Sequence, residues 1–263
     1  MGAGGSGRRA AARLLSIPGC APERRHQVFG RRRGRALRPG QKTLIDELLP
    51  RLAINLPASG RIDVAALFGD ARPSIWLEIG FGGGEHLAQL AEQHPQIGFI
   101  GCEVFENGIV KLLAQIERRR LGNIRIFADD ARLIIAALPP GSIGRVFILF
   151  PDPWPKRRQH KRRIVSRATL DGLAEIMSDD AELRVATDDA DYLCWILDRI
   201  TAHPAFAWLA RRPGDWRERP PDWPPTRYEA KARAAGRPTV FLRVKRRPRI
   251  RRGFRSPWRD GLG

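Results

Sequence analysis

The stretch with the clearest chemical signature holds an acid between prolines, beside an aromatic ring. An apolar run, 147–150, ends in Pro151-Asp152-Pro153-Trp154. Prolines fix the backbone dihedral φ and reduce the entropy that a loop loses on ordering. A carboxylate held in this way is preorganised to meet a flat heterocycle, against which the ring of Trp154 can stack. We therefore expect Asp152 to take part in binding or in the reaction.

Basic residues follow this stretch without an intervening acid. They are Lys156, Arg157, Arg158, His160, Lys161, Arg162 and Arg163. One explanation is a solvated face without a function, although such a face rarely carries so dense a run of one charge. The pattern is more typical of a strip that binds the phosphates of a nucleic acid. We expect that strip to lie beside Asp152.

A second stretch combines an acid with three alternating glycines. Glu78 ends an apolar run that begins after Pro73, and Gly80, Gly82 and Gly84 follow it. Glycine permits a sharp turn and a close approach to a ligand, and a strand, a glycine turn and a helix start form the nucleotide site of open α/β sheets. The spacing is acid-x-G-x-G-x-G, which differs from the dinucleotide fingerprint G-x-G-x-x-G. It resembles the first motif of class I S-adenosylmethionine-dependent methyltransferases; the alternative is a glycine-rich turn without a ligand.

Further acids end the next two expected strands. Glu103 ends the strand 98–104, where a carboxylate can accept hydrogen bonds from both hydroxyls of a ribose. Asp130 closes the following strand, where a polar group can accept from the amino group of an adenine. The neighbouring Asp129 is an equal candidate, and either residue can instead cap the next helix. These acids would surround one nucleoside.

Strands and helices alternate along the part of the chain that carries these acids. The alternation predicts an α/β fold with a doubly wound, mostly parallel, Rossmann-like sheet that binds ligands at the carboxyl ends of its strands. Segments 206–210 and 239–244 are expected to pair as a late antiparallel addition. The expected strands are 74–79, 98–104, 124–128, 146–150 and 182–186, and the expected helices are 41–52, 108–119, 131–138, 164–177, 192–201 and one that begins at 85.

Basic residues gather at both ends of the chain. The 263 residues carry a net charge of +19 at pH 7, which indicates a polyanionic partner, with nucleic acid as the first candidate. We expect residues 1–40 to be a disordered basic arm, residues 41–245 to be the methyltransferase domain and residues 246–263 to be a basic tail. Within the domain, residues 56–72 resemble a linker.

The spacing of cysteines and histidines argues against two kinds of stabilising site. Cys20, Cys102 and Cys194 lie far apart, so we expect neither a disulfide framework nor a metal site. No apolar run approaches the roughly 20 residues needed to span a bilayer. We therefore expect a cytoplasmic, monomeric protein without a membrane partner.

Five motifs resemble one family in particular, the bacterial tRNA (guanine-N7)-methyltransferases, from about residue 31 to residue 244. Pro155 departs from the family pattern, and Arg227 and Tyr228 replace similar residues of a Thr-Lys-Phe-Glu motif. The motifs are Glu78-Ile79-Gly80-Phe81-Gly82, Gly101-Cys102-Glu103-Val104, Phe150-Pro151-Asp152-Pro153-Trp154 with the basic run after it, Ala186-Thr187-Asp188 and Thr226-Arg227-Tyr228-Glu229.

The resemblance implies an enzyme that transfers a methyl group from S-adenosylmethionine to N7 of a guanosine in tRNA, namely guanosine 46 of the variable loop. It implies that Glu78, Glu103, Asp130 and Asp152 contact the cofactor at the glycine turn, and that Asp152 is also catalytic. It further implies that the substrate guanosine is bound by Lys156, Asp188, Thr226, Arg227, Tyr228 and Glu229.

The implied reaction fits these residue types. Guanine N7 offers a lone pair and has no proton to lose, so positioning should supply most of the rate. We expect Asp152 to orient the base and to stabilise its developing positive charge. Asp188 could accept hydrogen bonds from guanine N1 and N2, and Glu229 could do likewise or brace Arg227. The alternatives are a helix cap for Asp188 and a surface role for Glu229.

Two other functions fit part of the pattern. An RNA amino-group methyltransferase often carries an Asn or Asp before Pro-Pro and an aromatic residue, which Asp152-Pro153-Trp154 matches only in part. A catalytically silent RNA-binding protein on the same fold would keep the basic surface but need not bind the methyl donor.

Overall fold

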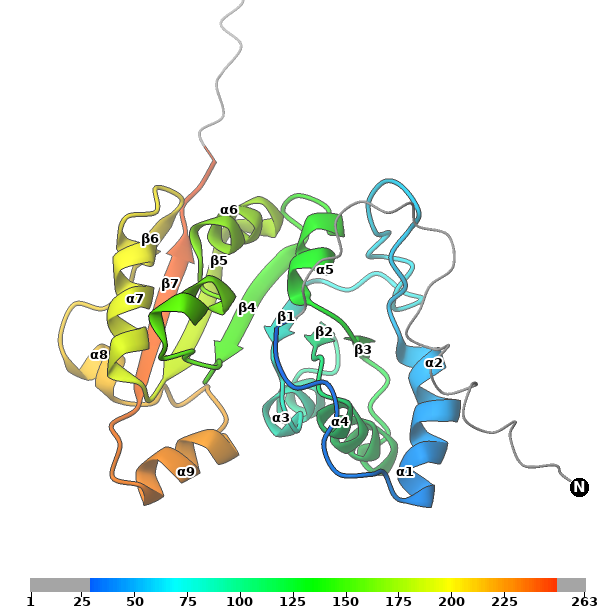
Figure 1. The fold of residues 1–263 in the computed structure, drawn as a ribbon. Coiled ribbons are helices and arrows are strands. Elements are labelled where there is room, and N and C mark those ends of the chain that lie inside the picture. Colours follow the sequence, from blue (N-terminus) through cyan, green and yellow to red (C-terminus); the bar gives the residue numbers. More distant parts are fainter. Residues whose placement is uncertain (1–28, 250–263) are drawn as a thin grey trace, which may run out of the picture.

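The computed structural model describes residues 29–249, which build a seven-stranded sheet with helices on both faces (Figure 1). The strand order is β3-β2-β1-β4-β5-β7-β6, in which β1 to β5 are parallel and β7 is antiparallel to both β5 and β6. The expected mostly parallel sheet with a late antiparallel addition is thus confirmed. The strands are β1 (Ile75–Ile79), β2 (Gly98–Cys102), β3 (Ile124–Phe127), β4 (Ile143–Leu149), β5 (Met177–Thr187), β6 (Phe206–Trp208) and β7 (Val240–Arg246).

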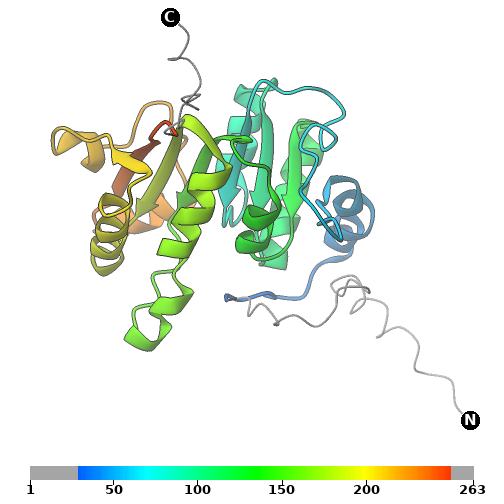
Figure 2. The same ribbon diagram turned by 90° about the horizontal axis from the view of Figure 1, so that it is seen from above.

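Two groups of helices cover the two faces of the sheet. The apolar sides of α5 (Ala131–Ala137), α6 (Arg167–Ile176) and α7 (Ala190–Thr201) pack on one face, along one side of the sheet in Figure 2. The other face is covered by α3 (Glu85–Gln93), α4 (Glu106–Arg119) and the buried ring of Trp223. The other helical segments of residues 29–249 are α1 (Pro39–Thr43), η1 (Leu44–Leu48), α2 (Leu49–Leu52), η2 (Arg157–Arg162), α8 (Gly214–Arg217) and α9 (Arg227–Ala234).

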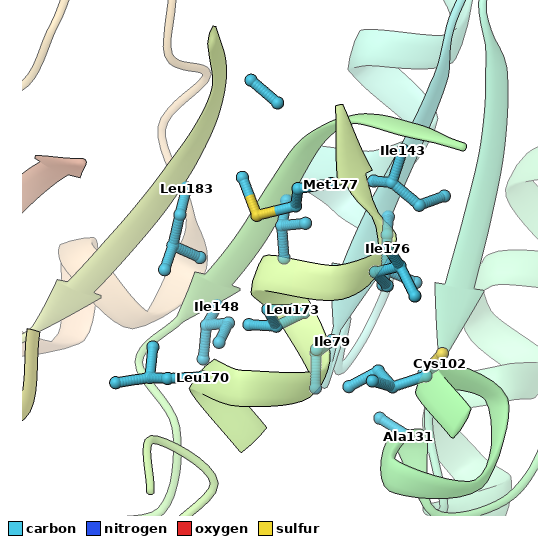
Figure 3. Close-up of a cluster of buried hydrophobic side chains, with 14 of the residues drawn as sticks. Ile79, Cys102, Ala131, Ile143, Ile148, Leu170, Leu173, Ile176, Met177 and Leu183 are labelled. Atoms are coloured by element: carbon cyan, nitrogen blue, oxygen red, sulfur yellow. The ribbon is translucent and has the colours of Figure 1, made fainter. Parts of the chain in front are cut away.

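Branched apolar side chains fill the layer between the sheet and α6. Ile79 of β1 and Ile148 of β4 face Leu170 and Leu173 of α6, and all four belong to one buried cluster (Figure 3). β-branched residues suit the pleated surface of a strand, and a central parallel strand is buried on both faces. This packing fixes the carboxyl ends of β1 and β4 side by side.

Side chains at the start of three helices fix where each helix begins. Ser166 caps α6 by accepting from the Thr169 N–H, and Asp189 caps α7 by accepting from the Tyr192 N–H at 2.7 Å. Thr226 caps α9 in the same manner. Such caps satisfy N–H groups that the helix itself leaves unpaired.

The structure differs from the sequence-based expectation in two segments before β1. The stretch 56–72 is not a linker, because Ile62 and Phe68 are buried in the core and the Ile62 N–H donates to the Ala137 carbonyl at 2.8 Å. The helical region expected from Gln41 begins at Pro39 and passes through one π-helical turn before Leu52.

The boundaries of the folded part also differ from expectation. Residues 29–38, expected in the basic arm, lie across the carboxyl ends of β1 and β2 (Figure 1) and bond to α4 through the Glu106 N–H, which donates to the Arg32 carbonyl at 2.9 Å. At the other end, β7 continues through Arg246. The rest of the expected arm, residues 1–28, and the tail residues 250–263 lie outside the described residues.

Of the helices in residues 29–249, none has both the length and the apolar composition needed to cross a lipid bilayer.

Candidate functional site

A cavity of about 320 Å³ opens at the carboxyl ends of β1 to β4. Open α/β sheets bind ligands at this edge because the loops after neighbouring parallel strands meet there. Most of its lining comes from the segment before the sheet and from the ends of four strands with the loops that follow them. These residues are Phe29–Arg31, then Ile79, Gly80 and Gly82 at β1, Cys102–Phe105 at β2, Asp129–Arg132 after β3, and Leu149–Asp152 with Trp154 at β4. Arg162, Ile164 and Tyr228 complete the lining.

The glycine turn after β1 uses its three glycines for different purposes. Gly80 has φ +74° and lines the cavity, and a Cβ there would meet no protein atom within 4 Å. Gly82 also lines the cavity, and a Cβ on it would lie 3.2 Å from the ring of Tyr228. Gly84 begins α3 outside the cavity, and a Cβ on it would lie 2.7 Å from Leu112. Gly80 and Gly82 therefore keep a ligand surface open, whereas Gly84 permits helix packing.

Glu103 is fixed by the backbone around it. Its Oε2 accepts from the Gly82 N–H at 2.8 Å, and its Oε1 accepts from the N–H groups of Val104 and Phe105 at 2.8 and 3.0 Å. Burial raises the pKa of the Glu103 carboxyl, the three N–H groups act against that rise, and the charge of Asp152 adds to it. A carboxylate has about four acceptor positions, so one position of Glu103 stays open toward a ligand.

Glu78 lies beneath the turn and not in the cavity wall. Its Oε2 lies 2.7 Å from Nδ1 of His86, and both side chains are buried. The His86 ring in turn meets the edge of Phe147 at a centroid distance of 5.0 Å. The acid at the end of β1 is thus tied to the first turn of α3 and stabilises the position of the glycine turn.

The two aspartates after β3 both line the cavity but are engaged differently. Asp130 caps α5, since its Oδ1 accepts from the Arg132 N–H, and its Oδ2 accepts from the Arg132 side chain at 2.9 Å. Asp129 is half-exposed, and its Oδ1 accepts from Arg32 at 3.2 Å and from the Asp130 N–H at 2.8 Å. The expected capping role therefore belongs to Asp130, and the more accessible carboxylate belongs to Asp129.

Asp152 lies at the rim of the cavity on a strained loop. Phe150 and Trp154, two residues before and after it, hold positive φ values of 51° and 46°. Such a backbone costs a non-glycine residue about 1–2 kcal/mol and persists only where the surroundings impose it. Burial raises the pKa of the Asp152 carboxyl. Asp152 and Glu103 line the same cavity.

The basic run after this loop divides into exposed and buried members. Lys156, Arg157, Arg158 and Lys161 are exposed. Arg162 instead packs over Trp154 at 4.8 Å and over Phe29 at 5.4 Å. Arg163, which we expected in the phosphate-binding strip, is only 1% exposed and cannot meet RNA. That part of the prediction is wrong, because sequence alone does not distinguish a solvated arginine from one stacked inside the fold.

Of the residues expected to hold the substrate base, Tyr228 lines the cavity and the others do not. Within the Thr226–Glu229 motif, the Tyr228 side chain reaches the cavity and stacks on Phe150 at 6.4 Å. Asp188 accepts from Arg237 at 2.8 Å. Lys156 precedes η2 and is exposed.

Glu229 does not brace Arg227. It is 4% exposed and accepts from Arg219 at 3.3 Å and from Arg233 at 3.2 Å. Arg227 instead lies 3.7 Å from Glu85 of α3. The proposed Glu229–Arg227 contact was wrong, since consecutive α-helical turns bring residues four apart together and residues two apart to different sides.

Comparison with known proteins agrees with this geometry. Residues 72–242 match a family model described as "Putative methyltransferase". Over 226 residues the chain is 50% identical to the tRNA (guanine-N(7)-)-methyltransferase of Rhodospirillum rubrum, covering 85% of this chain and 89% of that protein. It is 52% identical to the protein of the same name from Paramagnetospirillum magneticum, covering 88% and 97%. The chain belongs to the tRNA (guanine-N(7)-)-methyltransferase family.

Solved structures place this methyltransferase in a wider fold group. The 16S rRNA methyltransferase KamB superimposes with a TM-score of 0.52 at 16% sequence identity, covering 72% of this chain and 96% of that one. At this identity the likeness concerns the fold alone. It supports the class I methyltransferase architecture that the strand order indicates.

One wall of the methyltransferase cavity was missed from the sequence. Phe29 lies against the guanidinium groups of Arg132 and Arg162 at 5.8 and 5.4 Å. Gly34 donates its N–H to Asn107 Oδ1 at 2.7 Å, and Asn107 donates to the Arg35 carbonyl. The single aromatic residue in the arginine-rich block was the available signal, because an aromatic ring among arginines has stacking partners.

Proposed function

We propose that the protein transfers the methyl group of S-adenosylmethionine to N7 of a guanosine in tRNA, at guanosine 46 of the variable loop. The observation that carries this proposal is the position of Asp152: its carboxylate shares one cavity with Glu103 and the glycine turn, and an exposed basic run begins four residues later. Membership of the family supports the choice of substrate.

The cavity suits S-adenosylmethionine in size and chemistry. Its volume of about 320 Å³ lies in the range of small-molecule sites, and Gly80 leaves open space where a side chain would protrude. Glu103 would accept from the ribose, Asp129 or Asp130 from the adenine amino group, and Gly82 would flank the amino acid tail. Glu78 and Gly84 would support the cofactor by shaping the turn. When bound, the cofactor supplies an electrophilic methyl group.

Asp152 would act by charge and orientation. Guanine N7 attacks with its own lone pair, so no proton has to be removed. The purine ring becomes cationic as the bond forms, and a carboxylate at a fixed position stabilises that charge most where water is partly excluded. Asp152 is exposed in the protein without ligands, so the bound base and tRNA would have to supply that exclusion of water.

The base itself would be held by side chains around the rim. Tyr228 is placed to stack on a flat ring, since it already lies parallel to Phe150 at an interplanar angle of 22°. Asp188 and Glu229 would accept from the N1 and N2 donors of guanine, and Glu229, which is 4% exposed, would have to become accessible for this. Thr226 fixes the start of α9, and Arg227 and Lys156 bring positive charge to the neighbouring phosphates.

The tRNA would approach along the exposed basic run. Lys156, Arg157, Arg158 and Lys161 would contact phosphates, and the net charge of +19 favours this encounter at low salt. We further propose that the protein acts as a cytoplasmic monomer.

The test is a methyl-transfer assay with labelled S-adenosylmethionine and a tRNA transcript, followed by borohydride reduction and aniline cleavage. Only 7-methylguanosine makes the strand scissile, so cleavage at guanosine 46 is the expected result. Label without cleavage would indicate an amino-group methyltransferase. Absence of donor binding would indicate a silent RNA-binding protein.

A further inference from the structure

The loop that carries Asp152 has almost no hydrogen bonds of its own. At its start the Phe150 N–H donates to the Ala186 carbonyl at 2.8 Å. Three of the residues 151–155 are prolines and have no N–H to donate. Within residues 29–249, the only hydrogen bond to this segment comes from Arg163, whose Nε donates to the Pro153 carbonyl at 2.7 Å. The strained backbone on both sides of Asp152 therefore depends on an outside support.

Arg163 is held in one orientation by aromatic rings and a carboxylate. Its guanidinium carbon lies 4.9 Å from the ring centroids of both Tyr192 and Trp195. A terminal Nη forms an ion pair with Asp191. A planar guanidinium can stack and donate in two directions at once, which an ammonium cannot do. The orientation of Nε toward Pro153 thus follows from the packing of Arg163.

The support connects the Asp152 loop to α7. Asp191, Tyr192 and Trp195 all belong to the first turns of that helix. Trp195 Nε1 donates to the Val165 carbonyl at 2.7 Å, which ties the chain after Arg163 to the same helix. Asp188 directly precedes the Asp189 cap of α7. Arg163 therefore connects the loop of Asp152, to which we assign the methyl-transfer step, with the helix that follows Asp188, to which we assign the binding of the guanine edge.

We propose that Arg163 is a positioning residue that sets the Asp152 carboxylate through the Pro153 carbonyl, and that it does not bind phosphate. The proposal rests on the proposed function. A displacement of about 1 Å in a catalytic group can cost about 10²-fold in rate. Loss of the Arg163 hydrogen bond should therefore lower kcat and leave the binding of tRNA, which the exposed basic run provides, unchanged.

Arg163→Lys is the informative variant. It keeps the positive charge beside Asp191, but one ammonium cannot reach the carbonyl and the carboxylate with the geometry of Nε and Nη. We expect kcat on tRNA to fall about 10²-fold, with the tRNA Kd within about twofold of wild type, as a positioning role requires. Arg167→Lys is the matched control, because Arg167 lies exposed on α6 and, among residues 29–249, pairs only with Asp171; it should keep the wild-type kcat.

Two further variants separate positioning from a general structural role. Asp191→Asn removes the ion pair but keeps the Arg163–Pro153 hydrogen bond, and Asp191 is 68% exposed. It should keep kcat within about threefold, because the amide oxygen of Asn can still accept from the Arg163 Nη and the rings of Tyr192 and Trp195 still hold the guanidinium. Trp195→Leu removes one stacking face and should lower kcat about tenfold, again without a change in tRNA Kd. If Arg163→Lys does not fold, Trp195→Leu decides the question.

Three outcomes would overturn the proposal. The first is a wild-type kcat in Arg163→Lys or in a folded Trp195→Leu. The second is a fall in tRNA affinity that accounts for the lower activity of Arg163→Lys, and the third is a fall in kcat in Asp191→Asn as large as that in Arg163→Lys. Failure of the proposed function is a separate result, because wild-type protein would then form no 7-methylguanosine at all.

Discussion

Two sides of the site hold their carboxylates by different means. On the side to which we assign the methyl donor, called the donor side below, Glu103 accepts hydrogen bonds from three N–H groups of the backbone. On the side to which we assign the guanosine, called the guanosine side below, Asp188 accepts from the Arg237 side chain and Glu229 accepts from the side chains of Arg219 and Arg233. Backbone donors cannot leave without unfolding, whereas an arginine can rotate. The donor side is therefore formed before any ligand binds, and the guanosine side can exchange partners.

The chemistry of the partners makes such an exchange reasonable. Guanine offers N1–H and N2–H donors side by side along one edge, and a guanidinium group offers parallel N–H donors in a similar fork. In the free protein Arg237 bonds to Asp188, and Arg219 and Arg233 bond to Oε1 of Glu229, where under the proposed function a base would bond in the complex. Asp152 lies between the two sides and has no side-chain hydrogen bond within residues 29–249.

The largest effect is expected at Asp152, because it serves both sides. Asp152→Asn keeps the shape but removes the charge that stabilises the cationic base. We expect kcat on tRNA to fall about 10²–10³-fold, with a change of less than about tenfold in the Kd of S-adenosylmethionine. Single-turnover kinetics and titration calorimetry measure the two quantities. If Asp152→Asn kept nearly the wild-type kcat and bound S-adenosylmethionine with unchanged affinity, Asp152 would have no role in the reaction.

Glu103→Gln tests the preformed donor side. In the wild type both carboxylate oxygens of Glu103 accept from backbone N–H groups. In the variant an NH₂ group replaces one of these oxygens, and it cannot accept a hydrogen bond from the N–H that it faces. Hydrogen bonds to a charged group contribute about 1.5–3 kcal/mol, and we expect the donor Kd to rise about 10²-fold, with a lower melting temperature. Glu92→Gln is the control, since Glu92 forms an exposed pair with Arg119. Unchanged donor affinity would contradict the assignment of Glu103 to the cofactor.

The sequence predicted the donor side better than the guanosine side. Glu103 and the glycines lie next to strands with strong apolar patterns, so their place at the sheet edge follows from the order of the elements. Asp188 accepts from Arg237, and Glu229 accepts from Arg219, which lies 10 residues away in sequence; no local pattern indicates either partner. Only the Glu229–Arg233 pair, four residues apart on α9, follows from helical spacing. The burial of Arg163 between two rings of α7 was hidden for the same reason.

For the segment before α1, the sequence-based expectation was wrong because it predicted too little structure. Its arginines suggest a solvated arm, but Phe29 and Gly34 find partners on α4, α5 and η2 that only the folded chain brings together. Composition describes a segment in isolation, and a few specific contacts are enough to order a short piece of it. Residues 29–31 thereby add a wall to the cavity.

Phe29→Ala would open that wall. The ring contacts two guanidinium groups, and such contacts contribute about 0.5–1 kcal/mol each at partly exposed sites. We expect the donor Kd to rise about tenfold while the tRNA Kd stays within about twofold. Trp208→Ala, at an exposed position on β6, is the matched aromatic control and should change neither. If Phe29→Ala weakens tRNA binding alone, the segment belongs to the RNA surface and not to the donor side.

We expect the smallest effect from Arg237→Ala. This variant tests whether guanine displaces Arg237 from Asp188 when the tRNA binds. Arg237 is half-exposed and its pair with Asp188 at 2.8 Å is of the surface kind, which contributes about 0.2–1 kcal/mol. If guanine displaces Arg237, removing it frees Asp188 in advance, and the KM for tRNA should fall by about two- to fivefold with no change in melting temperature. Arg212→Ala, which breaks a comparable exposed pair with Asp215, should leave KM unchanged. A rise in KM would instead mean that Arg237 orients Asp188 for the base, and both sides of the site would then be preformed.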